Sequence, residues 1–221
     1  MRLKRAIECA VLFVGVPTAW ALGWIPVHIL ALLLAMTTVI VVALMLDRSF
    51  DRRALWNAGA VTKREFRRIV AQFAVGAALL TLAVWTWAPE LLFAFPRRNP
   101  HLYIVVMVLY PLVSVYPQEV AYRAFFFHRY GALFPGRVAM NAASAVAFGY
   151  MHVVFHNWIA VALCLAGGAL FAWTYARTRS TLLASIEHAL YGNFIFTVGL
   201  GIYFFHGTME LTRDVMTSIN P

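Results

Sequence analysis

Two oppositely charged side chains stand in the middle of one of the most apolar parts of the chain. Glu119 and Arg123 belong to the stretch YPQEVAYR, between the apolar runs HLYIVVMVLYPLVSV and AFFFHRY. Because they are four residues apart, they share one face of a helix and can form an ion pair. Either they lie at a break where water reaches them, or they face each other within a membrane. A salt bridge that only pins the helix is the simplest interpretation.

Two further apolar segments carry polar side chains that could take part in acid–base chemistry. His152 ends the stretch FGYMH, and the stretch SIEHALYGN contains Glu187, His188 and Asn193. Taken singly, each has an ordinary structural explanation, as a hydrogen-bonded packing residue or a polar helix start. Glu187 and His188 differ by about 100° around a helix, so at most one of them points straight into a given site.

Together these groups form a set that could hydrolyse a peptide bond. A charged side chain near the centre of a membrane helix costs about 2.5–3.5 kcal/mol on insertion scales, so it needs a partner or a function. A carboxylate, two imidazoles and an amide would supply a base for water, a group that assists the base, and donors to an oxyanion. The hypothesis requires three helices to bring these side chains to one place.

The composition indicates an integral membrane protein built from helices. Of 221 residues, 62% are hydrophobic and 12% are charged, and the mean hydropathy is +0.76. Soluble domains have about 45–50% apolar and about 25% charged residues. The apolar runs are too long and unbroken for the alternating pattern of a membrane β-barrel. Cys9 and Cys164 both fall inside apolar runs, so we expect neither a structural disulfide nor a cysteine metal cluster.

Seven segments are long enough to cross a bilayer, for which about 20 mostly apolar residues are needed. We predict spans over Ala6–Leu22, Val27–Leu46, Ile69–Phe95, Leu102–Phe127, Val138–Phe155, Trp158–Tyr175 and Leu182–Phe205. Pro111 and Pro117 predict a kink or a break in the fourth span, and Pro117 could instead start a new helix. The first span imitates a secretory signal with a cleavage site after Ala21, but we favour a retained helix because another apolar run follows.

The basic residues predict which side of the membrane each connection occupies. If the amino terminus is cytoplasmic, 14 of the 18 Lys and Arg lie on the cytoplasmic side and 3 lie outside, with Arg123 between them. This bias predicts a cytoplasmic amino terminus, an external carboxyl terminus and a plasma-membrane location, and it accounts for the net charge of +9 without nucleic acid. Residues 47–68 predict a basic amphipathic surface helix, with Thr62 and Glu65 spaced as a capping box.

The three polar motifs resemble those of a known protease family. QEVAYR, FGYMH and HALYGN are similar to the Glu-Glu-x-x-x-Arg, Phe-x-x-x-His and His-x-x-x-Asn motifs of the CAAX-protease and bacteriocin-processing (CPBP, or Abi) intramembrane endopeptidases. The resemblance covers about residues 100 to 205. It implies Glu119 as general base, His152 as a ligand of the attacking water, and His188 with Asn193 as the oxyanion hole. Arg123, Gln118 and Phe148 would support them.

The chain departs from the family pattern at two positions. Gln118 stands where the family has its first Glu, and an amide cannot act as a base, so Glu119 must replace it or the chain is inactive. Asn193 is the fifth residue after His188, which turns it about 140° beyond one full turn of an α-helix. We therefore predict a one-residue π-bulge at Gly192, which would bring Asn193 back to the face of His188.

The resulting hypothesis is an all-α, multi-spanning helix bundle of about seven helices, with a polar cavity that opens toward the cytoplasm. Residues 1–95 would form N-terminal helices with the basic loop, and residues 96–221 the catalytic core. The resemblance implies hydrolysis of a peptide bond in a membrane-associated peptide, with the bilayer as the other partner. A divalent metal such as zinc on Glu119, His152 and His188 and a metal-free mechanism are both consistent with the motifs. The alternatives are an inactive or immunity-type scaffold, favoured by Gln118, and a small proton-coupled transporter.

Overall fold

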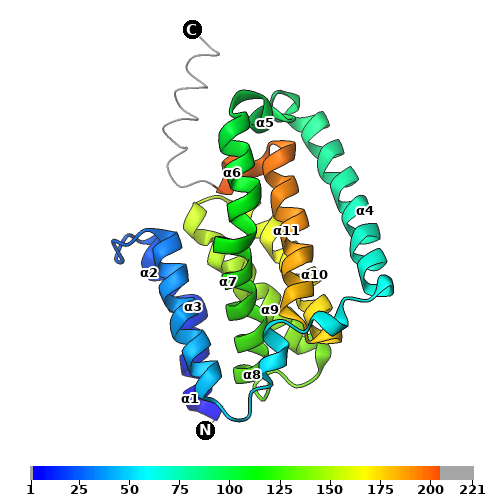
Figure 1. The fold of residues 1–221 in the computed structure, drawn as a ribbon. Helices are drawn as coiled ribbons and strands as arrows, with labels where there is room; N and C mark the ends of the chain where they lie inside the picture. The colour runs from blue at the N-terminus through cyan, green and yellow to red at the C-terminus, as the bar shows by residue number, and fades with distance from the viewer. Residues whose placement is uncertain (1, 205–221) are drawn as a thin grey trace.

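The computed structural model describes residues 2–204, which form an all-α bundle without a β-strand in that range (Figure 1). The predicted fold class is therefore confirmed. The α-helices are α1 Arg2–Ala10, α2 Val16–Ala21, α3 Ile29–Leu46, α4 Lys63–Trp87, α5 Ala94–Arg98, α6 Pro100–Tyr110, α7 Tyr116–Glu119, α8 Phe126–Tyr130, α9 Arg137–Met151, α10 Trp158–Thr178 and α11 Thr181–Val198. Short π- or 3₁₀-helical pieces are η1 Val11–Gly15, η2 Arg52–Leu55, η3 Ala58–Ala60, η4 Pro89–Leu91, η5 Pro111–Val115, η6 Val120–Phe125, η7 His152–Phe155 and η8 Leu200–Phe204.

The chain is an integral membrane protein, and each of the seven predicted spans overlaps one helical rod. The third rod ends at Trp87 and not at the predicted Phe95, which lies in α5. Among the described residues, five rods are long and apolar enough to cross a membrane: Ile29–Leu46, Lys63–Trp87, Pro100–Tyr130, Arg137–Phe155 and Trp158–Thr178. The other two are the N-terminal rod, which η1 divides, and α11, whose polar side chains lower its hydropathy. The end of the seventh predicted span at Phe205 and the predicted external carboxyl terminus lie outside the described residues.

The fourth rod is continuous from Pro100 to Tyr130, so of the two predicted outcomes, a kink or a break, the break does not occur. Two π-helical turns interrupt the α-helix instead: η5, which begins at Pro111, and η6, which follows Pro117. Proline has no N–H to give to the carbonyl four residues earlier, and a wider turn avoids the clash between its ring and that carbonyl. These turns set the rotation of α7, which lies between them and carries the pair Gln118 and Glu119.

The polar segment 47–68 does not form a separate surface helix, contrary to our expectation. Instead α4 begins at Lys63 and runs as one helix of 25 residues into the bundle. The predicted cap is confirmed in part, since the Thr62 side chain accepts a hydrogen bond from the Glu65 backbone N–H at 3.2 Å. The Glu65 carboxylate does not close the capping box but pairs with Arg177 at 2.6 Å. Four of the seven basic residues of this segment lie in the first turns of α4: Lys63, Arg64, Arg67 and Arg68.

The connection before α4 lies beneath the first turn of α11 and holds it in place. Thr181 donates to the Ala54 carbonyl at 2.9 Å, and Ser180 Oγ is within 3.2 Å of the Trp56 carbonyl and 3.1 Å of the Asn57 carbonyl. Ser180 also caps α11 by accepting from the Leu183 N–H. A loop distant in sequence thus positions the helix that carries His188.

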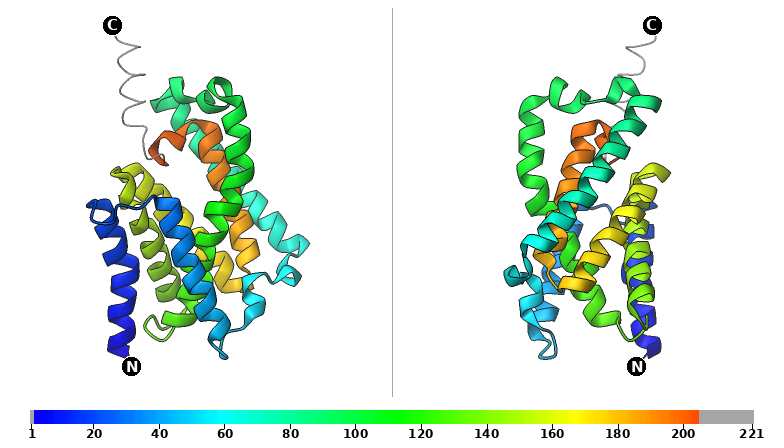
Figure 2. Two further views of the ribbon diagram at one scale, coloured as in Figure 1. Left: turned by 60° about the vertical axis from the view of Figure 1, so that its left-hand side comes forward. Right: turned by 90° about the vertical axis from the view of Figure 1, so that its right-hand side faces the viewer.

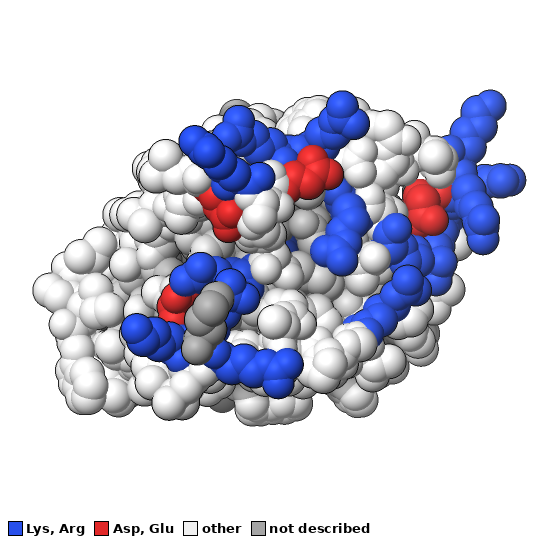
Figure 3. Space-filling view, turned by 90° about the horizontal axis from the view of Figure 1, so that it is seen from below, with Lys and Arg blue, Asp and Glu red and all other residues white. Residues whose placement is uncertain are grey.

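Basic side chains gather at one end of the bundle, the end that holds the amino terminus and α8 (Figures 1 and 3). We call it the basic end. Three acidic residues there are engaged in ion pairs: Glu8 with Arg129 at 2.7 Å, Asp47 with His128 at 2.9 Å and Glu65 with Arg177. The two side views show α4 lying alongside α11 on one flank and the N-terminal rod alongside α9 on the other (Figure 2).

Candidate functional site

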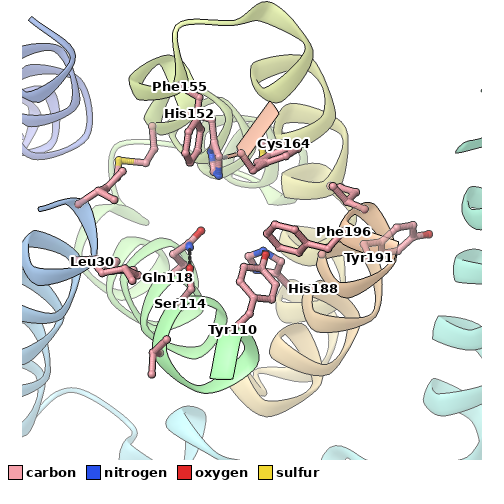
Figure 4. Close-up of a pocket in the computed structure, with 18 of the residues that line it drawn as sticks. Leu30, Tyr110, Ser114, Gln118, His152, Phe155, Cys164, His188, Tyr191 and Phe196 are labelled. Carbon is pink, nitrogen blue, oxygen red and sulfur yellow. Dashed lines mark hydrogen bonds between the residues drawn. The ribbon is translucent and has the colours of Figure 1, made fainter. Parts of the chain in front are cut away.

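A cavity of about 380 Å³ lies between α3, α6–α7, α9–η7, α10 and α11 (Figure 4). Its walls are mostly apolar. Polar groups on its lining include Tyr110, Ser114, Gln118, His152, Cys164 and His188. Since the lining takes its residues from the start of α3 and the end of α9, the cavity lies in the half of the bundle away from the basic end. With a cytoplasmic amino terminus, this is opposite to the predicted cytoplasmic opening.

Glu119 is fully buried behind the cavity wall and is not part of the lining. One carboxylate oxygen lies 3.2 Å from Arg123 Nε, which confirms the predicted ion pair. The other accepts a hydrogen bond from His188 Nδ1 at 3.0 Å. The carboxylate therefore holds the imidazole and the guanidinium together and does not contact the cavity itself.

Arg123 is also fully buried, and several groups compensate its charge besides Glu119. Its Nη1 donates to Ser144 Oγ at 2.5 Å and to the Tyr122 carbonyl at 3.3 Å. Its guanidinium carbon lies 5.1 Å from the centroid of the Phe148 ring. A buried cation needs such compensation, because an unpaired one would cost several kcal/mol.

His188 connects the buried carboxylate to the cavity. A carboxylate can only accept, so the hydrogen bond to Glu119 places a proton on Nδ1 and turns Nε2 toward the cavity. Nε2 lies 3.2 Å from the Tyr110 hydroxyl. The imidazole is stacked on Phe171, with centroids 4.6 Å apart, and is edge-on to Phe148 at 5.3 Å. These two rings fix its orientation.

His152 enters the same cavity from another wall (Figure 4). It stands where α9 tightens into η7, and its Nδ1 donates to the Phe148 carbonyl at 2.8 Å. Because a carbonyl can only accept, Nε2 is the unprotonated nitrogen of the neutral ring and is available to accept a proton. Phe148 contacts both histidines, with its ring 4.9 Å from that of His152, so this predicted supporting residue lies between them.

Gln118 faces the cavity, whereas its neighbour Glu119 points into the protein. The Gln118 amide donates to Ser114 Oγ at 2.7 Å, a contact drawn as a dashed line in Figure 4. The separation of about 100° between adjacent helical positions accounts for the two directions. The position that faces the cavity thus carries an amide where a carboxylate would be able to take a proton from water.

Asn193 does not join His188 in the cavity, and the predicted π-bulge at Gly192 is wrong. Helix α11 is regular from Thr181 to Val198, so Asn193 points away from the lining. Its amide donates to the Met107 carbonyl at 3.2 Å. That carbonyl lies four residues before Pro111, which has no N–H to offer it. Asn193 therefore satisfies a backbone group that a proline leaves free.

The residues expected to hold a metal do not fit one. Both Glu119 oxygens already have partners, in His188 and Arg123. Within residues 2–204, no three His, Cys, Asp or Glu side chains are grouped closely enough to bind an ion. A catalytic zinc site needs three protein ligands and an open position, so we derive no step through a metal.

Sequence reasoning missed four polar residues of the cavity lining: His28, Tyr110, Ser114 and Tyr191. Tyr110 and Ser114 lie on the rod that carries Gln118. With Gln118, they follow a spacing of four residues along one rod, which places them on one helix face. That spacing is the signal that could have identified them. The aromatic partner Phe171 has no comparable signal, because a Phe on an apolar helix is usually only a packing residue.

The fold and the cavity define a multi-spanning helical membrane protein with a buried carboxylate–imidazole pair beside an apolar pocket. Residues 100–195 match a family model described as Rce1-like, type II CAAX prenyl endopeptidase Rce1-like. This match covers all three polar motifs and confirms the resemblance to the CAAX-protease family. No curated protein and no solved structure matches the chain.

Proposed function

We propose that this protein is an intramembrane endopeptidase that hydrolyses a peptide bond in a membrane-associated peptide. The observation that supports this most strongly is the contact between Glu119 and His188, with His152 lining the same apolar cavity. The family match agrees with proteolysis as the reaction class. The apolar walls suit a segment of substrate that is presented from the bilayer.

The proposed mechanism assigns the general base to His152. Its Nε2 accepts a proton from a water molecule while the water oxygen bonds to the carbonyl carbon, and the carbonyl electron pair moves onto oxygen. His188 stabilises this developing negative charge, and His152 then gives its proton to the leaving amine as the C–N bond breaks. Gln118 also lines the cavity and would hydrogen-bond the water. No other group gains or loses a proton.

Glu119 takes a different role from the general base that the motif resemblance implies. Its carboxylate does not line the cavity, so it cannot take a proton from a water molecule there. It acts through His188, whose ring it orients by the hydrogen bond to Nδ1. An acidic partner of this kind fixes the tautomer of an imidazole and stabilises its protonated form, as in other hydrolytic sites.

Cleavage by the purified protein in liposomes tests the proposal. The substrates are membrane-anchored peptides, in prenylated and unprenylated sets, and mass spectrometry identifies the products. We expect cleavage by the wild type and a loss of at least about 100-fold in His152→Ala, since a general base contributes about 10²–10⁴. His156→Ala is the matched control, because His156 is exposed and does not line the cavity. Equal activity in all three proteins would overturn the assignment of His152.

A catalytically inactive scaffold is the second candidate, and Gln118 is the observation that favours it. The substitution Gln118→Glu places a carboxylate on the cavity face, close to Ser114. If the wild type cleaves none of the peptides and this variant does, the scaffold function is supported and the endopeptidase proposal fails. If the wild type is active, the scaffold is excluded.

A further inference from the structure

Tyr110 places its phenol hydroxyl in the cavity beside His188 (Figure 4). The residue ends α6, and its oxygen lies 3.2 Å from His188 Nε2. Its ring meets the imidazole edge-on at 6.2 Å between centroids and the Phe196 ring at 5.3 Å. The hydroxyl is thus held at the inner wall of the cavity, next to the group that would stabilise an oxyanion.

The Tyr110 ring fits there because residue 192 is a glycine. Gly192 is four residues after His188, so the two positions share a face of α11. A Cβ atom at position 192 would overlap Tyr110 Cε1 and its hydroxyl oxygen. The phenol therefore fills the space that a side chain one turn beyond His188 would otherwise occupy.

The amide that was expected to act beside His188 is engaged elsewhere. Asn193 donates to the Met107 carbonyl and does not line the cavity. An oxyanion in this cavity would then have His188 beside it and would need a hydrogen-bond donor from a residue on the lining. The Tyr110 hydroxyl is the group that lies within hydrogen-bonding distance of His188 Nε2.

Building on the proposed function, we infer that the Tyr110 hydroxyl is a catalytic residue that donates a hydrogen bond to the oxyanion, while His188 acts through its positive charge. With protons on both ring nitrogens, His188 donates Nδ1–H to Glu119 and Nε2–H to the phenol oxygen. The phenol proton is then free to point at the carbonyl oxygen of the substrate. Tyr110 keeps its proton throughout and forms no covalent bond. Its hydrogen bond strengthens as the carbonyl electron pair moves onto oxygen.

The substitution Tyr110→Phe tests this, with Tyr103→Phe as the matched control. Tyr103 lies on the same helix and also bonds α11, through Thr197 at 2.9 Å, but it does not line the cavity. We expect Tyr110→Phe to lower kcat by about 100-fold, the usual cost of removing one oxyanion donor, with KM within about threefold. Tyr103→Phe should keep the wild-type kcat. A Tyr110→Phe variant with wild-type kcat would overturn the inference and leave the proposed function intact.

A binding measurement gives a readout that does not need turnover. A peptide trifluoromethyl ketone hydrates to a tetrahedral form that can carry an oxyanion, whereas the matched peptide alcohol cannot. Tyr110→Phe should weaken binding of the ketone by about 100-fold and leave binding of the alcohol unchanged. Equal weakening of both would indicate a packing role for Tyr110 and overturn the inference. A wild type that neither cleaves peptides nor prefers the ketone would overturn the proposed function itself.

A rescue variant separates the hydrogen bond from the packing. Tyr110→Ala removes the ring, and adding Gly192→Asn places an amide one turn beyond His188 in the space so vacated. We expect the double variant to have at least tenfold higher kcat than Tyr110→Ala alone, while Gly192→Asn alone loses activity because it overlaps Tyr110. Thermal unfolding of each variant in detergent confirms that it is folded. A double variant no more active than Tyr110→Ala would contradict the replacement of one donor by the other.

Discussion

Glu119 holds two partners at once, and a single substitution tests how far the site depends on it. Glu119→Gln keeps the shape of the side chain but removes the negative charge from beside Arg123. Breaking a buried ion pair costs about 3–5 kcal/mol, because the remaining charge is left without its partner. We expect a comparable loss in the free energy of unfolding and a fall in kcat of at least about 100-fold, measured by thermal unfolding in detergent and by peptide cleavage.

The control for this substitution is Glu65→Gln. Glu65 is also in an ion pair, with Arg177, but that pair is partly exposed and lies at the basic end. Because water still reaches this pair, removing its negative charge should cost less stability than the same change at Glu119, and the activity should stay near that of the wild type. If Glu119→Gln were as stable and as active as Glu65→Gln, the Glu119 carboxylate would have neither the structural nor the positioning role.

At the scale of single residues, the sequence predicted which residues belong to the site better than it predicted the direction in which each side chain points. The four-residue spacing predicted the pair of Glu119 and Arg123, and the motif resemblance identified His152 and His188, two of the three histidines on the cavity lining. It could not show that Glu119 points inward while Gln118 faces the cavity, because the rotation of that helix depends on two π-helical turns around the prolines. Nor could it show that the backbone near Pro111 would engage Asn193, since that requires the packing of two rods that are distant in sequence.

The rod that carries Pro111 is joined to α11 through Asn193, and the substitution Asn193→Ala tests this link between elements. It leaves the Met107 carbonyl without its side-chain donor. An unsatisfied buried polar group costs about 1–3 kcal/mol, so we expect a loss of that size in the free energy of unfolding. Because Asn193 does not line the cavity, kcat per folded molecule should change by less than about threefold. A stable variant with kcat reduced 100-fold would instead place Asn193 in the oxyanion hole.

The presence of the helical rods could be predicted from the sequence, but the exact residues at which their helices begin, end or change to π-helical turns could not. Long apolar runs predicted where the seven rods lie, and five of these rods are long and apolar enough to cross a membrane. The sequence did not predict that α4 would begin at Lys63 and include the basic residues before the apolar span. A polar segment beside a span can either lie on the membrane surface or extend the helix of the span. The Thr62 cap indicated where that helix begins, but only the pairing of Glu65 with Arg177 shows that its first turn packs against the bundle.

The basic end of the whole molecule includes one ion pair whose strength depends on pH. Hydrogen bonds from Ser49, and then from His128, hold the pKa of the Asp47 carboxyl well below its usual range. A carboxyl whose pKa is lower in the folded state stabilises the fold above its unfolded pKa of about 3.9, and this contribution is lost as the pH falls through the folded pKa. We therefore expect the melting temperature of the wild type to exceed that of Asp47→Asn at pH 6–7.

The same comparison at lower pH provides the decisive measurement. Below about pH 4 the Asp47 carboxyl of the unfolded chain takes up a proton, whereas that of the folded chain stays ionised. The difference in melting temperature should therefore shrink as the pH is lowered further. Asp51→Asn is a suitable control, because Asp51 accepts a hydrogen bond only from the nearby Arg53 backbone. A difference that stays constant from pH 7 to pH 3 would show that the Asp47 charge contributes nothing to stability.

The position of the cavity relative to the basic end has a consequence for what the molecule would cut. Basic side chains gather at one end of the bundle (Figure 3), while His152 and His188 line a cavity in the opposite half. If the basic end lies at one face of the bilayer, the groups that we propose to react are held at a constant depth within it. Such a hydrolase would cleave the peptide bond that the membrane anchor of its substrate places at that depth. Lengthening this anchor by one helical turn would therefore shift cleavage to a different peptide bond.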